Sequence, residues 1–123
     1  MNLPFALCII YAGIIFGASS VPGNRLPHLF FADHILHLVE YMILGTLLAW
    51  WRSSTLKVHS PLIVVQATIF ASLYGLTDEF HQFFVPGRSP DPADWVADTV
   101  GAFIGAFAVF GIRQIMSIDK RRR

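Results

Sequence analysis

Four long apolar stretches, joined by short connections, constrain the fold of this chain more than any other feature. They cover approximately residues 3–18, 35–51, 61–84 and 95–115. A transmembrane helix needs about 20 mostly apolar residues, so each stretch approaches the length of one membrane crossing. The connections are rich in Pro, Gly and Ser and are too short to separate domains. The pattern predicts one all-α domain of 123 residues, an integral membrane four-helix bundle.

The composition supports this interpretation. Hydrophobic residues make up 54% of the chain and charged residues only 14%, whereas about 25% of the residues in a soluble domain are charged. The formal net charge of +1 excludes a broad basic face for nucleic acid, so we expect no nucleic-acid partner. The single cysteine, Cys8, excludes a disulfide within the chain.

The first stretch has an alternative interpretation as a secretory signal, because it is short and ends in small residues. No Lys or Arg precedes its apolar run, and Leu7 before Cys8 is a poor match to a lipoprotein cleavage site. We therefore predict that it is retained as a helix. Gly13 and Gly17 are spaced for close packing against a neighbouring helix.

Basic residues predict the orientation in the membrane. With four crossings, both termini and the second connection lie on one side, which carries Arg52, Lys57, Arg113, Lys120, Arg121, Arg122 and Arg123. The other side carries only Arg25 and Arg88. The positive-inside rule then predicts that both termini lie in the cytoplasm, an N-in and C-in topology.

Acidic residues have the opposite distribution. Asp119 lies on the inner side, and the others lie at or near the outer face: Asp33, Glu40, Asp78, Glu79, Asp91, Asp94 and Asp98. Acidic residues contribute little to orientation, so this asymmetry needs another cause. We expect a functional one.

At 100° per residue, the polar residues form one stripe on each of the last three helices. The stripes consist of Asp33, His37, Glu40 and Tyr41, then Gly75, Asp78, Glu79 and Gln82, then Asp94, Asp98, Gly101 and Gly105. An ionised carboxylate at the bilayer centre costs about 2.5–3.5 kcal/mol on insertion scales, so we expect the stripes to face each other across a wet pocket. Gly101 and Gly105 form a GxxxG pair that lets helices approach below the pocket.

The predicted ligand-binding residues are those of the pocket: Asp33, His37, Glu40, Tyr41, Asp78, Glu79, Gln82, Arg88, Asp94 and Asp98. We expect Arg88 to bind an anionic group. So many carboxylates need compensation by shared protons, a bound divalent metal or a cationic group on the ligand, and the sequence leaves all three open. If the protein is an enzyme, Asp78 or Glu79 is the candidate general base and His37 the candidate proton carrier or metal ligand.

Structural interpretations compete with the binding interpretation. Asp91 before Pro92 is typical of a helix N-cap, and Asp33 is suited to the start of the second helix, where the dipole favours negative charge. We expect His34 and His81 to be interfacial side chains and not ligands. A purely structural network of ion pairs is the alternative to a binding site.

Three spaced motifs in the sequence resemble the motifs of a known protein family. They are Asp33-x-x-x-His37-x-x-x-Tyr41-x-x-x-Gly45, then Gly75-x-x-Asp78-Glu79-x-x-Gln82-x-Phe84-x-Pro86-Gly87-Arg88, then Asp94-x-x-x-Asp98-x-x-Gly101. Together with Ser19-Ser20-x-Pro22-Gly23, they resemble the VanZ-like family of small bacterial membrane proteins over residues 19–105. Family members often have Lys at the position of His34 and Asn at the position of Asp98.

The resemblance implies a four-helix protein of the cell envelope, in the bacterial cytoplasmic membrane; the namesake of the family is associated with resistance to the glycopeptide teicoplanin. Three functions stay open. The pocket binds a lipid-linked precursor, a polar headgroup or an amphiphilic antibiotic; or the protein is an enzyme acting on a lipid or cell-wall intermediate; or it is an accessory subunit of a larger membrane complex. The corresponding partners are membrane lipids, an amphiphilic ligand and other membrane subunits.

Overall fold

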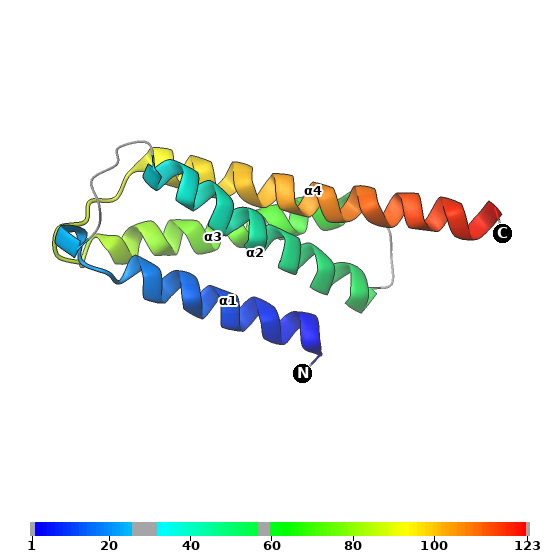
Figure 1. The fold of residues 1–123 in the computed structure, drawn as a ribbon, viewed down its shortest axis with the longest axis horizontal. Helices are drawn as coiled ribbons and strands as arrows, with labels where there is room; N and C mark the ends of the chain where they lie inside the picture. The colour runs from blue at the N-terminus through cyan, green and yellow to red at the C-terminus, as the bar shows by residue number, and fades with distance from the viewer. Residues whose placement is uncertain (1, 26–31, 57–59, 123) are drawn as a thin grey trace.

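A computed structural model describes residues 2–25, 32–56 and 60–122. In this part of the chain it contains four α-helices and no strand (Figure 1). The elements are α1 (Leu3–Ser19), the short 3-10 helix η1 (Gly23–Arg25), α2 (Ala32–Leu56), α3 (Leu62–Gln82) and α4 (Pro92–Arg122). The predicted all-α fold with four helices is confirmed, although α2 and α4 extend well beyond the apolar stretches.

Residues at the starts of three helices fix where these helices begin. The side chain of Asn2 accepts a hydrogen bond from the backbone N–H of Phe5 at the start of α1. The Ser60 hydroxyl accepts one from Leu62 at the start of α3, and α4 begins at a proline, a residue suited to the first helical turn. These bonds satisfy backbone donors that have no partner within the helix.

The helices form a bundle in which α2 and α4 make the most extensive contact, and α3 packs against both of them. The end of α1, the start of α2, the end of α3 and the start of α4 meet at one end of the bundle, at the left of Figure 1. The two chain termini lie at the opposite end, where α4 extends beyond the other helices. Lys57 and Arg123, two of the basic residues used to predict orientation, lie outside the described residues.

Glycines bring the backbones of α2 and α4 into contact. A Cβ atom on Gly101 would lie 2.1 Å from the carbonyl oxygen of Leu38, and one on Gly105 would lie 2.0 Å from that of Met42. Gly45 on α2 is equally close to the backbone of α4. Any side chain at these positions would push the helices apart, so the close approach predicted for the GxxxG pair is confirmed.

Helix α1 is held by its buried face and by a hydrogen bond from α3. Ile15 is buried in the core, and the Tyr74 hydroxyl donates to the carbonyl oxygen of Ala12 at 2.6 Å. A Cβ atom on Gly13 or Gly17 would have no described atom within 4 Å outside its own helix backbone and chain neighbours. The prediction that these two glycines pack against a neighbouring helix is therefore wrong within the described part of the monomer, because they lie on the open face of α1.

Many large apolar side chains of this protein are exposed, and several acidic side chains are buried. Large apolar side chains are exposed on all four helices, with Phe80 69% and Ile115 70% exposed, whereas Asp98 is fully buried. Soluble monomers rarely expose so many large apolar side chains, and they rarely bury acidic residues. Two helical segments, Asp33–Leu56 and Pro92–Arg122, are long and apolar enough to cross a membrane.

Candidate functional site

Two loops that pack backbone to backbone position Arg88 at the end of the bundle. The N–H of Gly23 donates to the carbonyl oxygen of Pro86 at 3.0 Å, and a Cβ atom on Gly23 would lie only 1.8 Å from the Gly87 oxygen. Gly87 has a φ of 75°, a conformation that L residues with side chains rarely adopt. The two glycines thus allow the turn and the close contact that precede Arg88.

Two histidines of α2 face two aspartates of α4 across the interface between these helices. His37 Nδ1 lies 2.9 Å from Asp98 Oδ1, and both side chains are buried. His34 Nδ1 hydrogen-bonds to Asp94 Oδ1, and His37 Nε2 lies 3.9 Å from Asp94 Oδ2. The predicted stripes of α2 and α4 therefore meet. Sequence reasoning missed the contact of His34, although its spacing of three residues from His37 places it on the same helix face.

Helix α3 contributes two buried carboxylates to the same region. Gln82 Nε2 donates to Asp78 Oδ2 at 3.4 Å, one turn along the helix. The backbone N–H of Asp91 donates to Glu79 Oε2 at 2.8 Å, which connects the end of α3 to the start of α4. Asp91 Oδ1 in turn accepts from the N–H of Ala93, so its predicted role as an N-cap is confirmed.

Several buried polar atoms of this region have no hydrogen-bond partner among the described residues. They are Ser19 Oγ, Tyr41 Oη, Glu79 Oε1, Arg88 Nε and Asp98 Oδ2. A buried polar atom without a partner costs about 1–3 kcal/mol, and more if it is charged. Buried polar atoms in native proteins are nearly all paired, so this concentration of unpaired atoms makes the region the candidate functional site.

A cavity of about 100 Å³ opens in this region, and two of these side chains, Ser19 and Arg88, are part of its lining. Its lining residues come from α1, α2, α3 and the loop before α4: Ala18, Ser19, Asp33, Leu36, His37, Glu40, Asp78, Gln82 and Arg88. The remaining predicted site residues lie outside the lining. Asp94 and Asp98 bind the histidines, Glu79 adjoins Asp78 in the chain, and Tyr41 is fully buried in the core.

Ser19 lines the cavity but was not predicted as a site residue. Its position in the Ser-Ser-x-Pro-Gly segment was the only signal in the sequence. His81, predicted to be interfacial, lies 3.0 Å from the Ser20 hydroxyl and does not line the cavity.

Two groups of three side chains are close enough to hold a metal ion. They are His34 with Asp91 and Asp94, and His37 with Asp78 and Glu79; in each group the ligand atoms lie within 4.8 Å of one another. In the first group, the His34–Asp94 bond and the N-cap bond of Asp91 already use these side chains. The second group combines two carboxylates with an imidazole and retains an unpaired carboxylate oxygen.

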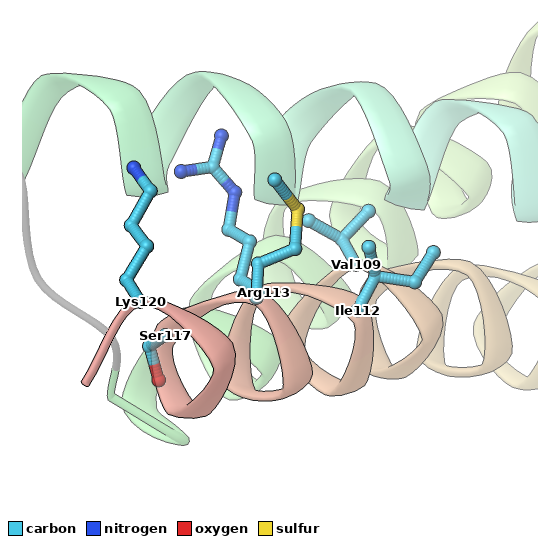
Figure 2. A pocket seen from close by; sticks show the side chains of 6 residues that line it. Val109, Ile112, Arg113, Ser117 and Lys120 are labelled. Carbon is cyan, nitrogen blue, oxygen red and sulfur yellow. The ribbon is translucent and has the colours of Figure 1, made fainter. Parts of the chain in front are cut away.

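A larger groove, of about 450 Å³, lies at the opposite end of the bundle between α4 and α2 (Figure 2). Its described lining residues are Val109, Ile112, Arg113, Met116, Ser117 and Lys120, none of which is acidic. Arg113 Nη2 donates to the Ser54 hydroxyl at 3.2 Å. This groove is separate from the polar region and contains none of the predicted site residues.

The residues that the structure describes form a small helical bundle. Two of its helices are long and apolar enough to cross a membrane, and polar side chains are buried at one end of the bundle. A family model described as VanZ/LLP1 matches residues 4–113. The chain therefore belongs to the VanZ/LLP1 family, and the resemblance to VanZ-like proteins is confirmed. No curated protein and no solved structure matches the chain.

Proposed function

We propose that this protein crosses the bacterial cytoplasmic membrane several times and binds the polar headgroup of a lipid-linked or amphiphilic envelope ligand in its outer cavity. The main observation that supports this proposal concerns Arg88. It lines the cavity, and its Nε atom is buried without a hydrogen-bond partner among the described residues. A guanidinium group binds phosphate or carboxylate through paired hydrogen bonds, so an anionic group in the cavity would supply the acceptor that Arg88 lacks.

The size of the cavity supports binding of a headgroup alone. Pockets for whole small molecules usually measure about 300–1,000 Å³, and this cavity measures about 100 Å³. It accommodates one small polar group. Ala18 and Leu36 line the same cavity and are themselves exposed, so an apolar chain attached to that group can continue into the surrounding lipid. The starts of α2 and α4 lie at this end and favour an anion electrostatically.

The proposed orientation, with the cavity outside and both termini in the cytoplasm, follows from the basic residues. Arg52 and Arg113 lie toward the end of the bundle that carries the chain termini, followed by Lys120 near the end of α4. Cytoplasmic segments of membrane proteins are enriched in such residues. The acidic cavity then faces the outer leaflet, where lipid-linked cell-wall intermediates and external amphiphiles are both accessible.

Native mass spectrometry of the protein, extracted from its own membrane in mild detergent, tests this function. We expect an anionic lipid to co-purify with the wild-type chain. Loss of charge-assisted hydrogen bonds costs about 1.5–3 kcal/mol, so Arg88→Ala should weaken retention roughly tenfold to a hundredfold. Arg25→Ala removes an exposed arginine from the same end of the bundle and outside the cavity. It is the matched control and should retain the lipid.

Equal lipid content in the wild type and in Arg88→Ala, both monodisperse by size-exclusion chromatography, would contradict the proposal. The same measurement separates two sources of ligand, because a membrane lipid co-purifies whereas an antibiotic binds only when it is added. Protection against a glycopeptide, as associated with the namesake of the family, is expected only if the antibiotic or its lipid-linked target occupies this cavity.

A further inference from the structure

We infer that His37, Asp78 and Glu79 form a site for a divalent transition-metal cation between α2 and α3. All three side chains are buried, with exposed fractions of 7%, 5% and 5%. Each offers one ligand atom, and these atoms lie within 4.8 Å of one another. Acidic residues gather in many proteins without a metal, so the inference rests on two further observations about the atoms of this group.

The first observation is the unpaired oxygen of Glu79. Its Oε2 atom accepts the backbone hydrogen bond from Asp91 at 2.8 Å, which fixes the position of the carboxylate. Its Oε1 atom is buried and has no hydrogen-bond partner among the described residues. The carboxylate is therefore oriented by one oxygen and has the other available for a cation.

The second observation is the hydrogen bond of His37. Its Nδ1 atom lies 2.9 Å from the buried Asp98 Oδ1 atom. In the neutral imidazole that donates from Nδ1 to this carboxylate, the lone pair is on Nε2. The distance of 3.9 Å from Nε2 to the nearest oxygen of Asp94 is too long for a hydrogen bond, so Nε2 is not engaged there. Metal-bound histidines in proteins almost always donate their other ring N–H to a carboxylate or carbonyl in this way.

Charge balance favours the same conclusion. The buried carboxylates of this region are Asp78, Glu79, Asp94 and Asp98. With His37 neutral as a metal ligand, the described side chains around them that can carry a positive charge are those of His34 and Arg88. Buried charges need compensation by pairing or by a metal. Two carboxylates and one imidazole suit Mn²⁺, Fe²⁺ or Zn²⁺ better than Mg²⁺ or Ca²⁺, which prefer oxygen ligands alone.

The metal site would explain how one cavity takes an anion despite its many acidic groups. His37 and Asp78 line the cavity together with Arg88. Three protein ligands leave coordination positions open, so an anionic headgroup would bind the cation and Arg88 at the same time. This role rests on the proposed function, whereas the metal site itself rests on the geometry alone.

Metal content tests the inference. The full-length protein is purified in detergent, stripped with EDTA, loaded with Mn²⁺ or Zn²⁺ and desalted. The metal per chain is then counted by inductively coupled plasma mass spectrometry. We expect one ion per wild-type chain and at least tenfold weaker binding by Glu79→Gln. Asp119→Asn, the same kind of carboxamide replacement at an exposed position near the end of α4 and outside the cavity, is the control and should bind as the wild type does.

A second measurement keeps the test decisive if Glu79→Gln fails to fold. The thermal midpoint of the wild-type protein should rise with added Mn²⁺ or Zn²⁺ and fall again with EDTA, because binding to the folded state alone stabilises it. Absence of stoichiometric metal in the wild type, or equal binding by a folded Glu79→Gln variant, overturns the inference. If lipid retention still depends on Arg88, only the metal site has failed; if metal binds and no lipid co-purifies, only the proposed function has failed.

Discussion

Replacing Gly101 with alanine should disrupt the polar cluster without touching any of its side chains. The new Cβ atom would lie 2.1 Å from the Leu38 carbonyl oxygen, whereas carbon and oxygen atoms normally stay about 3.3 Å apart. The helices α2 and α4 must therefore separate by about 1 Å. His37 and Asp98 span the same interface within one helical turn, so their 2.9 Å contact would lengthen to about 3.9 Å and cease to be a hydrogen bond.

Two costs lower the free energy of unfolding of the Gly101→Ala variant, and one gain partly offsets them. Overpacking of a well-packed interface costs about 1–3 kcal/mol, and a lost hydrogen bond with a charged partner costs about 1.5–3 kcal/mol. Alanine also has a higher helix propensity than glycine, by up to about 1 kcal/mol. Gly111→Ala on the same helix gains that propensity, and its Cβ atom has nothing within 4 Å. The difference between the two variants removes the propensity effect and should be at least about 2 kcal/mol.

Unfolding of both variants in mixed detergent micelles, followed by tryptophan fluorescence, measures this difference. Metal or lipid content gives a second reading, which should fall in Gly101→Ala and stay unchanged in Gly111→Ala. If the two variants unfold at the same denaturant concentration and retain equal ligand, the reasoning that backbone contact between α2 and α4 holds the site together is refuted.

Two further predictions concern the attachment of α1 and the orientation in the membrane. Tyr74→Phe removes the 2.6 Å hydrogen bond to the Ala12 carbonyl oxygen and should lower the free energy of unfolding by about 1 kcal/mol, measured by the same titration; no change would show that α1 is held by packing alone. In a Cys8→Ser background, a cysteine replacing the exposed Asn24 should react with a membrane-impermeant maleimide on intact spheroplasts, whereas one replacing the exposed Ser54 should react only after lysis. The reverse labelling pattern would invert the proposed topology.

The sequence predicted the number of helices but not their ends, because hydropathy measures the apolar stretch and not the hydrogen-bonded helix. Helix α2 continues past the last apolar residues to Leu56, where Ser53 is buried and Arg52 Nη2 donates to Gln66 Oε1 of α3 at 3.0 Å. Helix α4 continues to Arg122 through polar residues that have no hydropathy signal, although several of them favour helix.

Helical periodicity placed the polar residues of each helix on one face, but it could not predict which of them pair. Pairing depends on the axial register between helices, which here is set by backbone contacts at glycines. A Cβ atom on Gly75 would lie 2.6 Å from Asp98 Oδ2, so the glycine of α3 leaves space for the aspartate that binds His37. The contact between His34 and Asp94 depends on the same register. Because helical periodicity does not give this register, the contact could not be predicted, and the sequence indicated only an interfacial side chain at His34.

The packing below the cavity favours a binding site over a path through the bundle. Tyr41, buried directly after the cavity-lining Glu40, forms a core cluster with Ile15, Leu44, Ala71 and Ala102. At the same depth, glycines close the interface between α2 and α4 down to the backbone. Small residues and close contacts thus leave little space beneath the carboxylates in the part of the chain that the structure describes. A group that enters the cavity must therefore leave by the same end, which is consistent with the proposed binding of a headgroup.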